Sequence, residues 1–237
     1  MISFSDVSFS YEKSRSILEH ISFKIDEGEA VGLIGANGAG KSTLMKILLG
    51  LLKAEGTVTV GGKEVCEKNL KEIRKTLGFV FQNSDNQMFM PTVVEDITFG
   101  LVNYGMRKDE AEVKADKILE NLNIKDLKSR HNHTLSGGEK RMAAIATVLA
   151  MEPKVLLMDE PTSTLDPYNR RQVINIVNAL PQTKIITSHD LDMILDTCSR
   201  VILLSDGKIV ADGPAEQILK DQELLEAHRM ELPFRFQ

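Results

Sequence analysis

One glycine-rich stretch constrains this chain more than any other feature of its sequence. It occupies residues 35–43, after an apolar run at 30–34 that is typical of a buried strand and before a helical pattern that starts at Leu44. Strand, G-x-x-x-x-G-K-[ST], helix is the context that a phosphate-binding loop requires. Glycines allow backbone conformations that a Cβ would forbid, so successive N–H groups can turn toward a phosphate. The stretch therefore predicts a nucleotide site.

The residues of this loop have distinct predicted roles. A helix that begins at Gly40 or Lys41 adds unpaired N–H groups and the positive end of its dipole. Lys41 can reach the β- and γ-phosphates, and the Ser42 hydroxyl can bind Mg²⁺. A glycine-rich turn without a ligand is disfavoured, because the flanking strand and helix are both present. The predicted nucleotide contacts are Gly35, Ala36, Asn37, Gly38, Ala39, Gly40, Lys41, Ser42 and Thr43.

Composition excludes several classes of protein. The 237 residues suffice for a real core, and 42% hydrophobic with 27% charged residues is ordinary for a globular protein. A net charge of -5 without a long Lys/Arg cluster argues against a nucleic-acid partner. Cys66 and Cys198 are far apart, which favours a reduced setting. No apolar run approaches the ~18 residues that span a bilayer, and the N-terminus does not resemble a signal peptide. A role at a membrane would therefore need a partner chain.

The first third of the chain predicts antiparallel strands around the phosphate-binding loop. Alternating apolar and polar residues at 2–11 and 21–25 indicate half-buried strands. Residues 57–60, followed by Gly61 and Gly62, indicate one arm of a hairpin.

The middle of the chain predicts helices. A short helix at 69–76 precedes a buried strand at 78–82, and helical patterns follow at 92–104 and 109–122. No strong strand signal occurs from residue 83 to residue 153. We interpret this part as an inserted helical subdomain.

After Pro153 the alternation of strands and helices resumes. The predicted elements are a strand at 155–158, a helix opened by Pro167, a strand at 184–188, a hairpin across Asp206 and Gly207, a helix opened by Pro214 and a partly helical tail at 221–237.

Polar residues follow three of the predicted buried strands. Gln82 ends one strand, Asp159 and Glu160 follow another, and His189 follows a third. The carboxyl ends of parallel strands form the edge at which α/β sheets bind ligands. Buried acids are costly there unless they serve a cation or catalysis. Asp159 is placed to hold Mg²⁺, Glu160 to polarise the attacking water, and His189 to face the same ligand.

A glycine-containing helix start and one aromatic residue are less direct indications of a nucleotide site. Ser136, Gly137 and Gly138 precede a long apolar helix, so they form a second anion site at a helix N-terminus. One nucleotide rarely needs two such sites in one chain, which suggests a site shared between two chains. Tyr11 ends the first strand, where it could stack on an adenine or cover the core edge; spacing alone favours the second.

Together these motifs resemble the nucleotide-binding subunit of ABC transporters, over residues 2–213 and in that family's order. The matching positions are the phosphate loop 35–42, the glutamine loop at Gln82, the signature 135–139, the strand motif 155–159 with Glu160, the loop ending at Asp166 and the switch histidine His189. The resemblance makes Tyr11 the adenine-stacking residue. Glu139 stands where glutamine is common, and we expect function to be kept.

The resemblance implies a P-loop NTPase fold of ABC type: a RecA-like parallel sheet, an antiparallel β subdomain and an inserted helical subdomain. We expect a single domain over 1–237, with its core at 1–82 and 154–213, helical part at 83–153 and tail at 214–237. Two copies would face head to tail around two ATP molecules. Each site would combine Lys41, Glu160 and His189 of one chain with Ser136, Gly137 and Gly138 of the other; Ser42, Gln82 and Asp159 would hold Mg²⁺.

A narrower resemblance lies in residues 81–89 and 91–100, which look like the ATPase of energy-coupling factor transporters, importers of vitamins or of cobalt and nickel ions. Ser84 departs from the usual proline. The tail at 223–233 is similar to the cobalt/nickel branch. The implied partners are transmembrane subunits, a substrate-binding membrane component and a second ATPase, identical or paralogous. The implied place is the cytoplasmic face of the membrane, with Met88 and Phe89 near the partner.

Three alternatives stay open. One is a vitamin importer of the same type. Another is a soluble ABC ATPase in translation or DNA repair, although those often carry two cassettes or a long coiled-coil insertion. The third is a non-enzymatic nucleotide-binding regulator, against which the intact Glu160 and His189 argue.

Overall fold

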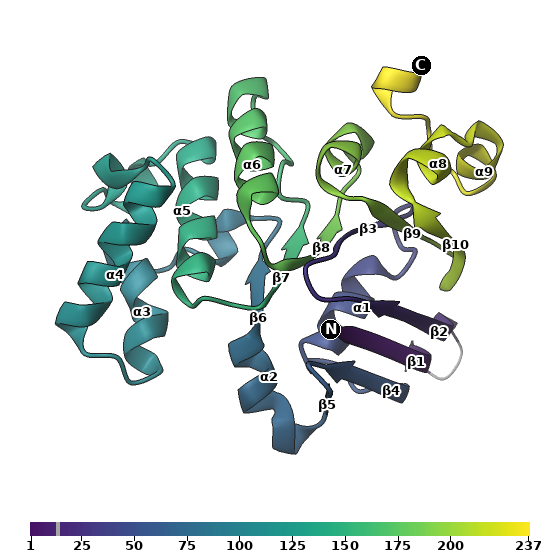
Figure 1. The fold of residues 1–237 in the computed structure, drawn as a ribbon, viewed down its shortest axis with the longest axis horizontal. Helices are drawn as coiled ribbons and strands as arrows, with labels where there is room; N and C mark the ends of the chain where they lie inside the picture. Colours follow the sequence, from purple (N-terminus) through teal and green to yellow (C-terminus); the bar gives the residue numbers. More distant parts are fainter. Residues whose placement is uncertain (13–14) are drawn as a thin grey trace.

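The computed structural model describes residues 1–12 and 15–237, and its strands form two sheets. The larger, six-stranded sheet has the order β10-β9-β3-β8-β7-β6 (Figure 1). Its strands are β3 (Ala30–Ile34), β6 (Leu77–Val80), β7 (Val155–Asp159), β8 (Thr183–Thr187), β9 (Arg200–Ser205) and β10 (Lys208–Pro214). All are parallel except the edge strand β10, which runs antiparallel to β9. The phosphate-binding loop therefore leaves a central strand.

The smaller sheet is antiparallel, with the order β2-β1-β4-β5. Its strands are β1 (Ile2–Glu12), β2 (Arg15–Ile25), β4 (Glu55–Val60) and β5 (Lys63–Glu64). Phe4 and Phe23 are paired in register and their rings stack at 4.7 Å between centroids. The predicted antiparallel strands are confirmed, and β2 is longer than the alternation at 21–25 indicated.

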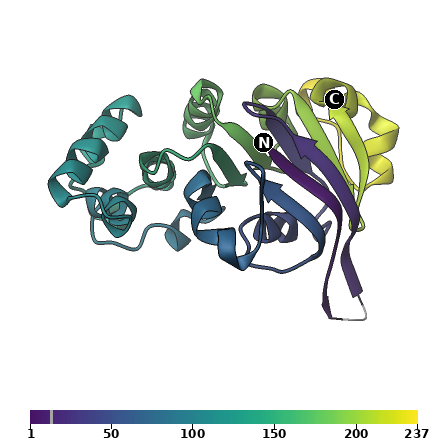
Figure 2. The ribbon, with the colours of Figure 1, turned by 60° about the horizontal axis from the view of Figure 1, so that its bottom comes forward.

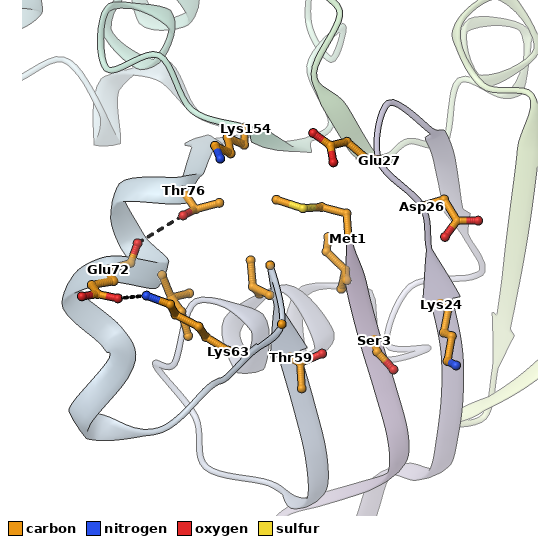
Figure 3. A pocket seen from close by; sticks show the side chains of 15 residues that line it. Met1, Ser3, Lys24, Asp26, Glu27, Thr59, Lys63, Glu72, Thr76 and Lys154 are labelled. Carbon is orange, nitrogen blue, oxygen red and sulfur yellow. Dashed lines mark hydrogen bonds and ion pairs between the residues drawn. The ribbon is translucent and has the colours of Figure 1, made fainter.

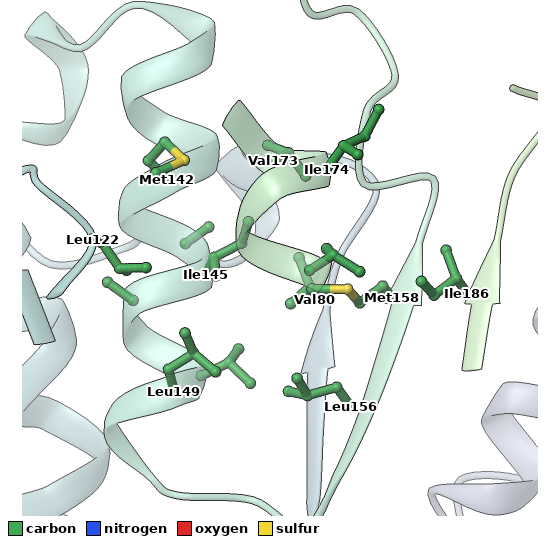
Figure 4. Packing of buried hydrophobic residues seen from close by; sticks show 14 of the residues in the cluster. Val80, Leu122, Met142, Ile145, Leu149, Leu156, Met158, Val173, Ile174 and Ile186 are labelled. Atoms are coloured by element: carbon green, nitrogen blue, oxygen red, sulfur yellow. The ribbon is translucent and has the colours of Figure 1, made fainter. Parts of the chain in front are cut away.

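Two layers cover the parallel sheet, and its strands contribute side chains to both. Leu156 and Met158 of β7 belong to the hydrophobic core with helices α5 (Gly137–Ala150) and α6 (Pro167–Ala179) (Figure 4). Val155 and Leu157, the alternate residues, belong to the core with α1 (Lys41–Leu48) and the antiparallel sheet. Strands buried on both faces explain why these segments read as continuous apolar runs.

The other helices lie around this framework. Helix α3 (Val93–Asn103) and helix α4 (Lys108–Asn121) pack with α5 at one end of the molecule, away from the antiparallel sheet (Figures 1 and 2). Thr92 caps α3 in a capping box with Glu95, as the predicted cap required. The remaining helices are α2 (Leu70–Thr76), α7 (Leu191–Thr197), α8 (Ala215–Lys220) and α9 (Gln222–Ala227).

One local expectation was wrong, and one helix was not predicted. The strand predicted to reach Gln82 ends at Val80, because the next residues bond with groups from the helical part of the chain instead of the sheet. Helix α7 was missed, since seven residues are too few for a clear helical period; Asp190 caps it by accepting from the Met193 N–H at 2.9 Å.

In the part of the chain that the structure describes, no helix combines the length and the apolar character needed to cross a membrane.

We expect Ile145→Ala to lower the free energy of unfolding by about 2–5 kcal/mol, because the fully buried side chain would leave a cavity between α5 and the sheet. Val113→Ala on α4 is the matched control: its side chain is 57% exposed, so the change should stay below about 0.5 kcal/mol. Urea denaturation measures both. Equal losses of unfolding free energy in the two variants would contradict the packing of Ile145 between α5 and the sheet.

Candidate nucleotide site

Most of the predicted site residues meet in one open pocket of about 480 Å³ at the carboxyl edge of the parallel sheet. The lining residues come from β1 and β2, from the phosphate-binding loop with the start of α1, from the end of β7 and from the segments that follow β6, β7 and β8. They are Tyr11, Ile17, Asn37, Gly38, Ala39, Gly40, Lys41, Ser42, Thr43, Gln82, Asp159, Glu160 and His189. Gly35 and Ala36 lie in the same loop but do not line the pocket.

Two glycines fix the shape of the loop. Gly35 has a φ of 146°, and a Cβ there would lie 2.2 Å from the Leu204 carbonyl oxygen on β9. Gly40 has a φ of 109°, and its Cβ would lie 2.6 Å from Cδ2 of Leu18 on β2. The loop is thus held against both sheets: a larger residue at Gly35 would meet backbone, and one at Gly40 would meet a side chain and need a φ that residues with a Cβ rarely adopt.

Lys41 begins α1, and its ammonium group folds back into the loop. It donates to the carbonyl oxygens of Gly35 at 2.6 Å and Ala36 at 3.1 Å. Burial lowers the pKa of Lys41, although the Glu160 and Asp159 carboxylates oppose this shift. A buried cation whose hydrogen-bond acceptors are neutral carbonyls gains from an anionic partner, which a phosphate would supply.

The acidic pair at the end of β7 is held by β8. Asp159 Oδ1 accepts from the Thr187 hydroxyl at 2.5 Å. Glu160 Oε2 accepts from the Ser188 hydroxyl at 3.2 Å and from the His189 N–H at 3.1 Å, and its side chain is only 12% exposed. Glu160 also has a φ of +47°, a strained conformation for a non-glycine residue that costs about 1–3 kcal/mol. Backbone and hydrogen bonds together fix where this carboxylate points.

His189 joins the acidic pair to the phosphate-binding loop. Its Nε2 lies 2.9 Å from Asn37 Oδ1 and 3.7 Å from Glu160 Oε1. With a proton on Nε2, His189 donates to Asn37, and its position therefore depends on the loop. Sequence reasoning placed both residues in the site but did not predict this contact.

The donors predicted for Mg²⁺ are oxygens of three kinds. Ser42 offers a hydroxyl, Asp159 a carboxylate and Gln82 an amide, and all three residues line the pocket. Mg²⁺ takes oxygen ligands and usually binds through few protein groups together with substrate phosphates. The chemistry of this donor set fits the ion.

Tyr11 lies at the rim of the same pocket, near the end of β1. Its ring is 57% exposed and meets Phe9 edge-on, with 4.9 Å between centroids. The ring is therefore supported from one side and accessible to a flat ligand.

The second anion site does not join this pocket within one chain. Ser136 caps α5 and is exposed with Gly137, whereas Gly138 is buried against Asn169. None of the three lines the pocket that holds Lys41. The Ser136 N–H is taken by Glu139, whereas the Ser136 hydroxyl and the Gly137 backbone are exposed and accessible to a ligand held by another molecule.

Glu139 has a structural role at this helix start. Its Oε2 accepts from the Ser136 N–H at 2.7 Å, the Ser136 hydroxyl accepts from the Glu139 N–H at 3.3 Å, and Arg130 lies 3.1 Å from Oε1. These hydrogen bonds and the Arg130 charge hold the pKa of Glu139 below its usual range. Glutamine could make the same capping bond, so this departure leaves the helix start intact.

Sequence reasoning missed several polar residues that shape the segments beside the site. Buried Asp96 accepts from the N–H groups of Phe89 and Met90, both at 3.1 Å, and from Asn132; burial raises the pKa of Asp96. Arg141 donates from α5 to the backbone after β6. The available signal was a charged residue inside an apolar helical stretch.

Another hollow, of about 640 Å³, lies between the antiparallel sheet and α2 (Figure 3). Both lysines and acids line it, and Lys63 pairs with Glu72. None of the predicted site residues lines it. Its mixed charge offers no concentration of one sign for a charged ligand.

The fold and the pocket together define a P-loop ATPase of the ABC type. Residues 18–163 match the family model described as "ABC transporter", and the chain belongs to that family. ABC ATP-binding cassettes hydrolyse ATP to power transport, and this chain is such an ATPase. The expected α/β fold is thereby confirmed.

Two relatives cover almost all of the chain. A protein of Geobacter sulfurreducens, whose name describes an ABC transporter ATP-binding protein, is 46% identical over 233 residues, 98% of this chain and 94% of its own length. The energy-coupling factor transporter ATP-binding protein EcfA1 of Oenococcus oeni is 42% identical over 241 residues, 99% of this chain and 86% of its own.

Two solved structures share the fold. cbiO1 of Clostridium perfringens, described as part of the ABC transporter complex cbiONQ, superposes with a TM-score of 0.86 at 33% identity, covering 95% of this chain and 93% of that one. A dimeric ATP-binding cassette, MJ0796, bound to ADP and Pi, gives a TM-score of 0.81 at 26% identity, over 91% and 99%. ABC ATPases dimerise and work with membrane components.

We expect Glu139→Ala to lower the free energy of unfolding by about 0.5–1.5 kcal/mol, because the Ser136 N–H loses its acceptor. Glu139→Gln should stay within about 0.5 kcal/mol of the original, since it loses only a partly exposed ion pair with Arg130. Urea denaturation compares the two. If glutamine destabilises as much as alanine, the charge and not the cap holds this helix start.

Proposed function

We propose that this chain is the ATPase subunit of an energy-coupling factor importer and that it works as a dimer. One observation carries the proposal: Lys41, Glu160 and His189 line a single pocket, while the exposed Ser136 helix start lies outside it. The resemblance of residues 81–100 to this transporter type and the name of the Oenococcus oeni relative support the choice of importer.

Within one chain, ATP would lie on the phosphate-binding loop. The loop N–H groups and Lys41 bind the phosphates, and Tyr11 stacks on the adenine. Glu160, fixed by Ser188 and the His189 N–H, accepts hydrogen bonding from the attacking water and polarises it. His189 orients this arrangement through its bond to Asn37. Mg²⁺ on Ser42, Gln82 and Asp159 would neutralise charge on the β- and γ-phosphates.

Closure of the dimer would complete the site. Ser136, Gly137 and Gly138 of one chain would bind the γ-phosphate of the ATP held by the other. ATP then favours the closed dimer because only that state offers these contacts. Hydrolysis removes the γ-phosphate, and the closed dimer is then no longer favoured.

We propose a single domain over 1–237, with a nucleotide-binding core at 1–82 and 154–213, a helical part at 83–153 and a tail at 214–237. The membrane partner would dock on the helical part, from the cytoplasmic face. Phe89 is 64% exposed there and meets the half-exposed Phe99 edge-on at 4.9 Å. Asp96 holds the backbone of Phe89, which keeps this pair of rings outward.

The cargo we propose is cobalt or nickel, on the basis of the tail at 223–233. A vitamin importer is the second candidate, because its ATPase shares the segment 81–100. Uptake of radioactive nickel and of labelled vitamins by cells carrying the complete transporter separates the two.

Glu160→Gln tests the proposed function. The substitution keeps shape but removes the carboxylate, so hydrolysis should fall by about 100-fold or more while ATP binding persists. The variant should elute as an ATP-dependent dimer in size-exclusion chromatography. Phosphate release measures the first effect and a fluorescent ATP analogue the second. Hydrolysis at the original rate would remove Glu160 from its role, and an absence of hydrolysis in the original protein would favour a regulator.

Phe89→Ala tests the docking surface. We expect transport to fall at least about tenfold while the ATPase activity of the isolated chain is kept, because the exposed ring lies outside the nucleotide pocket. Met88 was expected to contact the membrane partner beside Phe89, but it is buried in the core.

Met88→Ala is therefore the variant to compare with Phe89→Ala, and it should lower the thermal stability of the chain. Co-purification of Phe89→Ala with its membrane partner at the original yield would contradict docking here, and co-purification with ribosomes or DNA would favour the soluble ATPase.

A further inference from the structure

The backbone that carries Gln82 is bonded to the helix that begins at Ser136. We call this set of bonds the α5 clamp. It joins Lys140, Arg141, Ala144 and Thr147 on α5 to Phe81, Gln82, Asp85 and Gln87 on the segment after β6. The segment 81–87 is therefore fastened to the helical part of the chain, although it continues a strand of the parallel sheet.

Arg141 is the centre of the α5 clamp. Its side chain is only 3% exposed, and it donates to the Phe81 carbonyl oxygen at 2.6 Å and to the Gln82 carbonyl oxygen. Its Nε is also buried, without a hydrogen-bond partner among the described residues. No acid pairs with this buried cation in the described chain, so its bonds to the loop are what offset its desolvation.

Gln87 and Lys140 complete the α5 clamp from the other side. Gln87 accepts from the Phe81 N–H at 3.2 Å and donates to the Ala144 carbonyl at 2.6 Å and the Thr147 hydroxyl at 2.8 Å. Lys140 pairs with Asp85 at 2.5 Å. The backbone N–H of Phe81 is thus bonded to Gln87 and its carbonyl oxygen to Arg141, and neither bonds to a neighbouring strand. The position of Gln82, the next residue, therefore depends on α5 more than on the sheet.

A displacement of α5 must therefore move Gln82. Ser136 caps the helix five residues before Arg141, so the end that would meet a phosphate and the central residue of the clamp lie on the same short stretch of α5. In the proposed dimer these two ends serve different nucleotides. Ser136 faces the ATP on the partner, whereas Gln82 lines the pocket of its own chain.

We propose that Arg141 is a positioning residue that couples the two nucleotide sites of the dimer: engagement of Ser136 by one ATP sets Gln82 against the other. This inference rests on the proposed function, because it requires a shared site. Arginine suits the task, since its planar fork donates to two neighbouring carbonyls at once and a lysine ammonium lacks that geometry.

The first experiment compares Arg141→Lys with Lys184→Met in the full chain. Lys184 is the matched control, a 6% exposed cation that donates to the Leu180 carbonyl at 2.5 Å; it lies near the amino end of β8, paired with Ala30, and the site lies at the carboxyl edge of the sheet. We expect Arg141→Lys to lower phosphate release by about 10- to 100-fold, with ATP affinity in EDTA unchanged, because only Gln82 is misplaced. Lys184→Met should keep the rate. Gln87→Leu, which removes the other side of the clamp, should lower the rate in the same way.

A readout apart from activity is hydrogen exchange at residues 78–87. In the original protein, nucleotide binding should slow exchange of this segment as the dimer closes, and in Arg141→Lys that response should be lost while exchange in α5 still responds. An unchanged response in segment 78–87 would overturn the proposal.

Mixed dimers locate the effect. One protomer carries Glu160→Gln, so a single site hydrolyses ATP, and Arg141→Lys is placed on either protomer. Single-turnover phosphate release should fall when the variant lies on the chain that supplies Gln82 to the competent site and stay unchanged when it lies on the chain that supplies Ser136. Equal losses in both arrangements would overturn the coupling while leaving the proposed function standing. Failure of the original protein to hydrolyse ATP or to form an ATP-dependent dimer would overturn the proposed function, and the inference with it.

Discussion

The close approach of the phosphate-binding loop to both sheets is the constraint on which the rest of the structure depends. A Cβ at Gly35 would lie 2.2 Å from the Leu204 carbonyl of β9, and one at Gly40 would lie 2.6 Å from the Leu18 side chain of β2. The loop can adopt this path only without side chains there. Because β9 and β2 belong to different sheets, the loop is also where the two sheets are held together around α1.

The parallel sheet places the chemistry because its strands are buried on both faces. Side chains within β7 alternate between two cores, so its polar groups reach the pocket only at the carboxyl end of the strand. Asp159 and Glu160 occupy that edge, and bonds from Thr187, Ser188 and the His189 N–H fix both carboxylates. The pocket therefore owes its geometry to contacts between neighbouring strand ends.

Sequence patterns were sufficient for most elements and for most residues of the pocket. Long apolar strands and well-capped helices such as α3 carry local signals that survive folding, since the cap bonds lie within a few residues. Local sequence patterns failed to predict structure where residues far apart along the chain decide where a strand ends or which side chain is buried. The strand before Gln82 ended early because Arg141, 60 residues away along the chain, takes the Phe81 carbonyl. Met88 and Phe89 could not be separated by polarity, and packing buried the first while leaving the second outward.

The sequence by itself determined the class of protein, the order of its elements and most of the residue types that line the pocket. These follow from short-range backbone requirements, such as glycine in a tight loop and a cap before a helix, that any fold of this chain must respect. The tertiary structure alone decided which groups touch: that His189 bonds to Asn37, that Ser136 stays outside the pocket, and that the backbone of Gln82 belongs to α5 more than to its own strand. Such contacts join residues far apart along the chain, and only the packing of helices on a twisted sheet brings them within hydrogen-bond distance.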